Sequence, residues 1–192
     1  MPRAKQDLRL TKRLVDGLAA AAQARPRSFW ERQFELLTDV VDGMGYEVSL
    51  EPKAEDRVEL GESKTIIINS TKRAESRFYT LLHEVGHILI RRNWKRFSRD
   101  YPRYLLGPND GHDRRRERGR SYQVALIAEE IEAWRRGLAF ARRKGYHVDP
   151  DKYDRESSES VHSYIVWSFN LNSRTRDAGQ RAAKTRKGRR SQ

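Results

Sequence analysis

The chain of 192 residues contains no cysteine, and no apolar run approaches the roughly 20 residues that cross a bilayer. Without thiols there can be no disulfides or thiolate metal sites, so any metal must take its ligands from His, Asp or Glu. Hydrophobic residues are scarce at 36%, whereas charged residues make up 35%. This composition predicts one folded domain with additional solvated segments, in a cytoplasmic protein without membrane contact.

Positive charge is abundant but unevenly distributed. Residues 1–90 carry 14 basic and 14 acidic side chains, whereas residues 91–120 carry 11 basic and four acidic ones. Residues 173–192 carry eight basic side chains and one acidic. The net charge of +13 therefore resides in a mid-chain segment and a tail, and we expect the folded body to be nearly neutral.

Hydrophobic spacing and composition divide the chain into three regions: N-terminal helices in residues 1–44, a folded domain in 45–170, and a basic, disordered tail in 171–192. In the first region, apolar residues at steps of three and four predict helices over residues 6–24 and 28–43. Ser28 and Glu31 have the spacing of a capping box, which favours a helix start at this point.

The domain is predicted to combine strands with helices. Residues 46–52 alternate, and residues 57–69 include a turn at Gly61 and a β-branched run, so together they predict a small antiparallel sheet. Helices are predicted over residues 73–91, 121–143 and 153–169. Residues 93–120 hold Pro, Gly and charge runs and are predicted to form a long basic loop. The predicted fold class is therefore α+β.

The helix predicted over residues 73–91 contains the sequence HEVGH, an H-E-x-x-H pattern. Residues i and i+4 share one face of a helix, so His83 and His87 can aim their imidazole nitrogens at one metal ion. Glu84 is displaced by about 100°, where it can reach a water molecule beside the metal without being a ligand. The pattern predicts a zinc site with Glu84 as the catalytic residue.

The apolar residues of this helix lie away from the two histidines. A core stripe within about 80° of Phe78 comprises Leu81, Leu82, Val85, Ile88 and Leu89. His83 and His87 fall on the opposite side, where Tyr79 and Ile90 indicate that this face is covered as well. The alternative is a structural protein in which two histidines of an ordinary helix face solvent.

A catalytic zinc site needs a third protein ligand. The metzincin class requires His at position 93 and Gly at position 90, but the chain has Asn93 and Ile90. The helix predicted over residues 121–143 carries three carboxylates instead: Glu129, Glu130 and Glu132. A ligand from this helix would complete a site of two histidines and one glutamate.

Glu130 is the carboxylate that falls on the apolar side of its helix. The predicted apolar stripe comprises Ile131, Trp134, Leu138 and Ala141. A carboxylate there costs several kcal/mol unless it is paired or metal-bound, so Glu130 is either a zinc ligand or the partner of a buried arginine. Glu129 and Glu132 are predicted to be solvated, and Glu132 can pair with Arg136. The rival ligands are His112, His147 and His162.

The chemistry predicted for these residues is metal-assisted hydrolysis of a peptide bond. Zinc would polarise the scissile carbonyl while Glu84 takes a proton from water and passes it to the leaving amine. Three side chains are candidate donors to the developing oxyanion: Tyr164, His162 and Tyr122. The edge of the strand over residues 64–70 could pair with an extended peptide substrate.

The sequence TIIINSTKRAESRFYTLLHEVGHILI resembles the ImmA/IrrE-type zinc peptidases. Those proteins show a strand ending in Asn, a short connection, and then R-F-T-x-x-H-E-x-G-H. The matching residues here are Asn69, Arg77, Phe78, Thr80, His83, Glu84, Gly86 and His87. Tyr79 separates Phe78 from Thr80, so Arg77 and Phe78 match with a shift of one residue.

The family's downstream E-x-x-A element resembles Glu130-Ile131-Glu132-Ala133. By this resemblance Glu130 is the third zinc ligand, although Trp134 stands where the family often has Asn or Asp. The resemblance covers about residues 45–140 and implies a gluzincin-like fold, with the small sheet packed on the helix of the H-E-x-x-H motif. It also implies a regulatory peptidase, because some members cleave or relieve DNA-bound repressors.

The basic segments suggest a second partner, since Lys and Arg can neutralise the phosphates of DNA or RNA. The candidate contacts are Arg114, Arg115, Arg116, Lys184, Arg186, Lys187, Arg189 and Arg190. No recognition helix is visible, so such binding would be non-specific, and a solvated tail or an acidic protein partner is the alternative. The alternative to a peptidase is a non-catalytic zincin-like domain that binds nucleic acid or a regulator through these segments.

Overall fold

A computed structural model describes residues 28–100 and 119–189 of the chain, with side chains described through residue 170. The elements follow in the order α2 (Phe29–Asp42), β1 (Glu47–Glu51), β2 (Arg57–Val58), β3 (Thr65–Asn69), α3 (Ala74–Arg92), α4 (Trp94–Asp100), α6 (Arg120–Lys144) and α7 (Pro150–Arg189). The α+β fold class is as predicted. The helix predicted over residues 6–24 lies outside the described residues.

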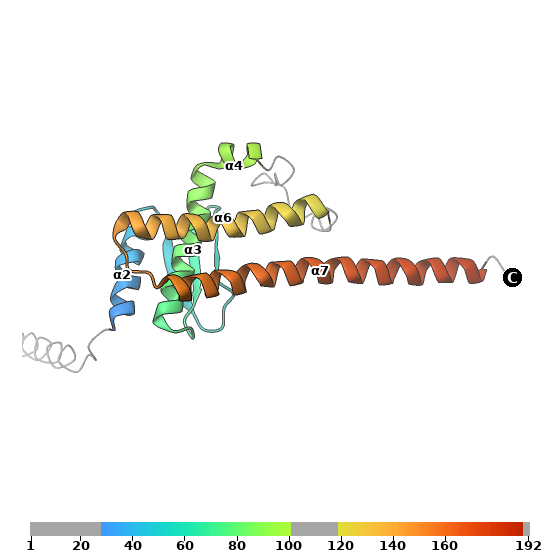
Figure 1. Ribbon diagram of the computed structural model, residues 1–192, viewed down its shortest axis with the longest axis horizontal. Coiled ribbons are helices and arrows are strands. Elements are labelled where there is room, and N and C mark those ends of the chain that lie inside the picture. Colours follow the sequence, from blue (N-terminus) through green and yellow to red (C-terminus); the bar gives the residue numbers. More distant parts are fainter. Residues whose placement is uncertain (1–27, 101–118, 190–192) are drawn as a thin grey trace, which may run out of the picture.

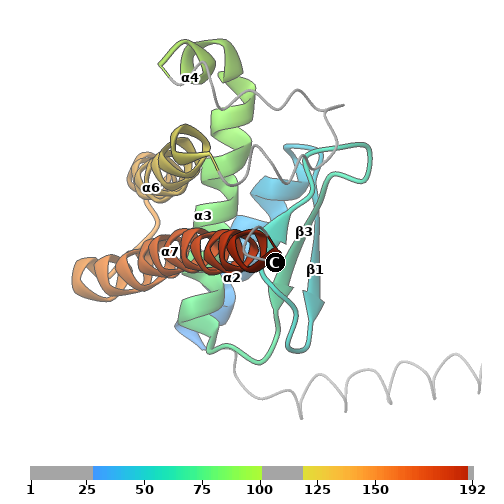
Figure 2. The same ribbon diagram turned by 90° about the vertical axis from the view of Figure 1, so that its right-hand side faces the viewer.

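Helix α3 lies between the sheet on one side and α6 on the other (Figure 2). Helices α6 and α7 run side by side in opposite directions across α3 (Figure 1). Helix α2 packs on α3 and contributes Phe34, Leu37 and Val41 to the same core. The second of the predicted N-terminal helices is therefore part of the domain, because its apolar stripe is buried against α3.

The predicted ends of α2 and α6 are confirmed. Ser28 accepts a hydrogen bond from the Glu31 amide at 3.2 Å, while the Glu31 carboxylate accepts one from the Ser28 amide at 2.7 Å. This reciprocal pair is the predicted capping box. Gly145 ends α6 with a φ of 74°, a left-handed conformation that favours glycine.

The sheet is mixed, not antiparallel as predicted. Its order is β1-β3-β2, in which β1 pairs with β3 in parallel and β2 pairs with β3 antiparallel. Alternation in sequence indicates that a segment is a strand but not which neighbour it pairs with. Strand β3 is central, and β1 and β2 are the edge strands. Both edges of the strand over residues 64–70 are therefore occupied, and it has no free edge for the predicted pairing with an extended peptide.

Two segments predicted to be irregular are helical. Within the predicted loop, residues 94–100 form α4 and bury Phe97 against Ile90 and Ala133. The apolar pair Trp94 and Phe97 is the signal that the surrounding charges obscured. Helix α7 continues to Arg189, into the segment predicted to be disordered, and projects beyond the body (Figure 1). No proline interrupts it, and its residues 171–189 are rich in Arg, Ala and Lys, which favour helix.

The helices are nonetheless polar. None within residues 28–100 and 119–189 combines the length and the apolar character that a membrane span requires.

Candidate metal centre

Two glycines allow α3 and α6 to cross in close contact. A Cβ atom on Gly86 would lie 2.0 Å from the Ala133 carbonyl oxygen, and one on Gly137 would lie 2.3 Å from that of Leu82. Glycine alone permits backbones to approach this closely. Gly86 lies between the two histidines of the motif, and Ala133 lies one turn after Glu130, so this crossing brings Glu130 to the histidines. Sequence reasoning gave neither glycine this role, although a glycine inside a predicted helix is the available signal.

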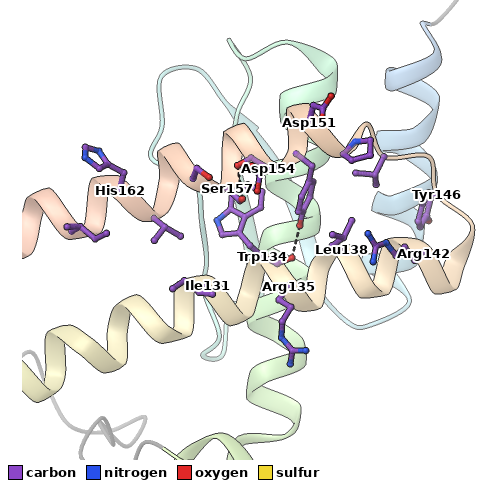
Figure 3. Close-up of a pocket in the computed structure, with 16 residues that line it drawn as sticks. Ile131, Trp134, Arg135, Leu138, Arg142, Tyr146, Asp151, Asp154, Ser157 and His162 are labelled. Atoms are coloured by element: carbon purple, nitrogen blue, oxygen red, sulfur yellow. Dashed lines mark hydrogen bonds between the residues drawn. The ribbon is translucent and has the colours of Figure 1, made fainter.

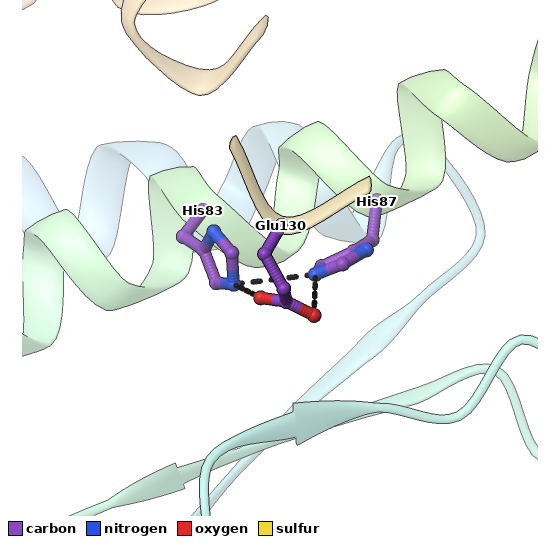
Figure 4. A group of neighbouring side chains, drawn as sticks. All are labelled: His83, His87 and Glu130. Carbon is purple, nitrogen blue, oxygen red and sulfur yellow. Dashed lines mark hydrogen bonds and ion pairs between the residues drawn. The ribbon is translucent and has the colours of Figure 1, made fainter. Parts of the chain in front are cut away.

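The side chains of His83, His87 and Glu130 converge on one point (Figure 4). The two Nε2 atoms lie 3.2 Å apart. Nε2 of His83 is 3.2 Å from Oε2 of Glu130, and Nε2 of His87 is 3.6 Å from Oε1. Ligand atoms that surround a tetrahedral zinc ion at about 2.0–2.1 Å are themselves about 3.3–3.4 Å apart. These three residues could therefore hold a metal ion.

The donor set fits a cation better than an internal ion pair. Glu130 is 4% exposed, and its Oε2 atom has no hydrogen-bond partner. Within the described part of the chain it pairs with His83 and His87 and not with an arginine, which is the alternative that the sequence left open. Two facing Nε2 atoms can share at most one proton between them. A cation at their common point would satisfy both nitrogens and the carboxylate.

The rival histidines lie elsewhere. His147 contacts the rings of Phe29 and Trp30, with centroids 5.7 and 5.8 Å away. His162 lines a separate groove between α6 and α7 (Figure 3). His112 lies outside the described residues. His162 is therefore neither a ligand nor, as the sequence also suggested, an oxyanion donor at this centre.

His87 is held by a second carboxylate. Glu129 was predicted to be solvated, but its side chain is 13% exposed, and its Oε1 atom lies 3.4 Å from Nδ1 of His87. A carboxylate at Nδ1 favours the tautomer that leaves Nε2 free to bind metal. Burial would lower the pKa of His87, but the hydrogen bonds with Glu129 and Glu130 raise it well above its ordinary value. The helical wheel failed for Glu129 because this part of the polar side of α6 lines a cleft and not open solvent.

His83 is held by packing instead. Its ring stacks on Trp134 with centroids 4.5 Å apart and planes 24° apart. Nδ1 of His83 and Nε1 of Trp134 are both buried without a hydrogen-bond partner. The sequence identified Trp134 as a core residue, and its contact with His83 was missed.

Glu84 has the environment of a proton acceptor. It is 4% exposed, lines the same cleft as the cluster, and has no hydrogen bond or ion pair among the described residues. Burial raises its pKa against the attraction of His83 and His87. Glu130 differs, because its interactions with His83 and His87 outweigh its burial and lower its pKa to about 2. The two buried carboxylates are therefore suited to different tasks, one to proton transfer and the other to binding a cation.

The cluster opens into a cleft of about 1160 Å³. Its floor is α3 and α6, one wall is β2 with the residues before it, and α7 forms the other wall. Tyr164 of α7 lies in this wall, and its burial and the nearby Glu130 carboxylate raise its pKa. Of the three predicted oxyanion donors, the structure thus brings Tyr164 to the centre, while Tyr122 is not among the cleft-lining residues.

The groove on the other side of α7 is a separate cavity of about 850 Å³ (Figure 3). Ile131 lines it and is 51% exposed, although it was predicted to lie in the buried stripe of its helix. Helical spacing predicts that Ile131 and Trp134 lie on the same side of α6, but only Trp134 is buried in the structure.

The residues predicted to contact nucleic acid lie outside the part of the chain whose side chains are described. Arg114, Arg115, Arg116 and Arg190 lie outside the described residues, and Lys184, Arg186, Lys187 and Arg189 belong to the C-terminal part of α7, whose backbone is described.

No protein-family model, curated protein or solved structure matches the chain. The resemblance to ImmA/IrrE-type peptidases therefore rests on the motif residues and stays a prediction.

Proposed function

We propose that the chain is a zinc-dependent metallopeptidase in which His83, His87 and Glu130 bind the metal and Glu84 is the general base. One observation carries the proposal: two imidazole nitrogens and a carboxylate converge at tetrahedral spacing beside a buried, unpaired glutamate. Two histidines and one glutamate form a ligand set that catalytic zinc sites use. A structural zinc site would require a fourth protein ligand and would have no use for Glu84.

The residues around the proposed metal site have separate roles in hydrolysis. Bound zinc supplies Lewis acidity that polarises the scissile carbonyl. Glu84 accepts a proton from the attacking water and returns it to the leaving amine, and its raised pKa suits both steps. Tyr164 lies beside Glu130 and donates a hydrogen bond to the developing oxyanion. His83, Glu84 and Glu130 are each buried, which strengthens these charge interactions.

The substrate is a protein or an extended peptide. Arg57 and Val58 of β2 line the cleft, and their strand lies at the edge of the sheet, so a substrate can add to it by main-chain hydrogen bonds. The resemblance to ImmA/IrrE-type peptidases supports a regulatory protein, such as a DNA-bound repressor, as the natural substrate.

Metal content and cleavage test this proposal in one set of variants. The wild-type protein is expected to bind about one equivalent of zinc, and His83→Ala to retain less than ~0.2 equivalents. Glu84→Gln should keep the zinc and lose peptide cleavage by about 10²–10⁴-fold. The matched control is Glu132→Gln, which changes a carboxylate of α6 outside the cleft. Zinc binding that is unaffected by His83→Ala would contradict the metal site, and cleavage that survives Glu84→Gln would contradict the mechanism.

A second candidate function is a non-catalytic metal-stabilised domain that binds nucleic acid. A groove of about 570 Å³ between α4 and α6 favours it, because the groove is lined by Arg96, Arg135, Arg136 and Arg143. Glu132 already pairs with Arg135 and Arg136, which leaves less charge for phosphates. Glu84→Gln separates the two functions, since a non-catalytic domain would keep its biological effect in this variant.

A further inference from the structure

The cleft carries more carboxylates than the proposed chemistry uses. Besides those at the metal centre, its lining includes Glu55, Asp56, Glu156 and Glu159. It also includes Arg57, Lys72 and Arg73. Arg57 pairs with Glu59 outside the cleft, and Lys72 pairs with Asp56 at 2.5 Å. The cleft therefore retains negative charge that its own basic residues do not neutralise.

Glu156 and Glu159 are one turn apart on the α7 wall, and neither forms an ion pair with Lys or Arg within the described part of the chain. Glu156 is half-buried, and its Oε1 atom accepts a hydrogen bond from the Ser76 hydroxyl at 2.6 Å. Burial raises the pKa of Glu156, and the hydrogen bond from Ser76 and the charge of Lys72 offset this only in part. Glu159 is exposed. Lys72 forms its ion pair with Asp56, so a cation supplied by a ligand would reduce the cost of burying the Glu156 carboxylate.

Helix geometry gives the distance of these carboxylates from the metal centre. Tyr164, which contacts Glu130, follows Glu159 by five residues and Glu156 by eight, about 7.5 and 12 Å along α7. On α3, Ser76 precedes His83 by seven residues, which is about 10.5 Å. The distances along the two helices are similar, as expected, because Ser76 and Glu156 are hydrogen-bonded to each other. An extended peptide advances about 3.3 Å per residue, so the carboxylates lie about two to four residues from the metal centre.

We infer that the cleft selects a cationic peptide, whose lysine or arginine binds Glu156 and Glu159 at about two to four residues from the scissile bond. The inference rests on the proposed peptidase function, because the metal centre defines where that bond lies. Glu84, buried and unpaired in the same cleft, independently marks the position of the reacting group. The rest of the α7 wall is uncharged, through Ser163, Tyr164 and Trp167, so the selection applies to one side of the bond.

Peptide binding tests this inference apart from catalysis. Zinc-loaded Glu84→Gln protein is titrated with fluorescein-labelled peptides that share one sequence except for a pair of lysines, glutamines or glutamates. The lysine peptide should bind about five- to tenfold more tightly than the glutamine peptide, and the glutamate peptide more weakly than either. The preference should decrease as salt rises, because exposed charges are screened.

Variants assign the preference to α7. Glu156→Gln with Glu159→Gln should abolish it, and Glu156→Lys with Glu159→Lys should invert it in favour of glutamate. The matched control is Asp154→Asn, since Asp154 lies on the same helix but lines the other groove (Figure 3). Zinc content and circular dichroism establish that each variant is folded.

The outcomes distinguish this inference from the proposed function. Equal affinity for lysine and glutamate peptides, or a lysine preference that survives both double variants, would overturn the charge selection even if the wild-type protein cleaves peptides. A lysine preference in binding, together with no cleavage of any peptide by the zinc-loaded wild-type protein, would support the charge selection and overturn the peptidase function.

Discussion

His83 and His87, the two histidines of the candidate metal centre, lie one turn apart on α3, yet their surroundings differ. On the His87 side, the Glu129 carboxylate lies 3.4 Å from Nδ1, whereas on the His83 side Nδ1 has no partner and the ring stacks on Trp134. A hydrogen bond fixes both the rotation and the tautomer of an imidazole, while stacking fixes only the plane of the ring. Electrostatics therefore prepare His87 for the metal, and packing prepares His83.

The close approach of α3 and α6 at Gly86 positions Glu130 against both histidines, so a substitution there should have the largest effect. Gly86→Ala places a Cβ atom 2.0 Å from the Ala133 carbonyl oxygen and so separates α3 from α6. Glu130 then withdraws from both histidines, and we expect zinc affinity to fall by more than about 100-fold. The free energy of unfolding should fall by about 1–3 kcal/mol. Zinc titration and urea unfolding measure the two effects. Gly61→Ala is the control, because nothing lies within 4 Å of a Cβ atom at that position.

Trp134→Ala should damage the His83 side. The indole is 6% exposed, so its removal leaves a cavity and lowers the free energy of unfolding by about 3–5 kcal/mol. Without the stacked ring His83 can rotate, and zinc affinity should fall as well. Trp134→Phe keeps a ring on His83 and removes the unsatisfied indole nitrogen, so it should retain most of the zinc affinity. A large loss of zinc in Trp134→Phe would show that stacking is not what holds His83.

Glu129→Gln should damage the His87 side with a different signature. Loss of the carboxylate at Nδ1 is expected to lower zinc affinity by about 10–100-fold while lowering the stability of the metal-free protein much less than Trp134→Ala does. Competition with a fluorescent chelator measures the affinity. If Glu129→Gln and Trp134→Ala lowered stability equally, the distinction between an electrostatic and a packed side would be wrong.

The metal-free protein should show a pH dependence that originates mainly on the His87 side. The pKa of His87 is raised above 6.5 in the folded state, so its pairing stabilises the fold below that pH and is lost as pH rises through the folded-state pKa. The pKa of Glu130 is lowered from 4.5 to about 2, so its stabilisation is present above pH 4.5 and is lost as pH falls toward 2. Zinc binding should instead tighten with rising pH, because the proton on His87 competes with the metal. Urea unfolding in a chelator across this range, with Glu129→Gln as comparison, checks both directions.

The smallest expected effect lies outside the centre. Glu132 orients Arg136 at 2.7 Å, and Arg136 donates a hydrogen bond to the Leu89 carbonyl at 2.8 Å, which links α6 to α3. Glu132→Gln should lower the free energy of unfolding by about 0.5–1 kcal/mol and leave zinc affinity unchanged. A loss of zinc in this variant would show that the whole α3–α6 contact, and not the two histidine environments, determines the affinity.

The sequence predicted the parts of this site that follow from helical spacing. His83, His87 and Glu84 share one helix, so their relation is fixed by about 100° per residue. Glu130 was identified because a carboxylate on an apolar face needs a partner. Glu129 was misjudged, because a wheel locates the apolar side of one helix and cannot show that α7 and β2 cover its polar side.

The sequence also could not predict which distant segments of the chain pair with one another. Alternation identified the strands, but the parallel pairing of β1 with β3 depends on where the chain returns after β2. The role of Gly86 likewise depends on how closely another helix approaches, which no local pattern encodes. His162 and Tyr164 are two residues apart and point into different cavities, a distinction that required the position of α7.

Helix α3 is buried on every side from Phe78 to Gly86, so His83 and Glu84 are built into the part of the molecule that is hardest to open, and His87 directly follows it. The ligands should therefore be in place before the metal arrives, unlike those of small zinc domains that fold only around their ion. A chelator should remove the metal without unfolding the protein, and added zinc should restore it without a refolding phase. Hydrogen exchange at the amides of this segment should require global unfolding, with or without the metal.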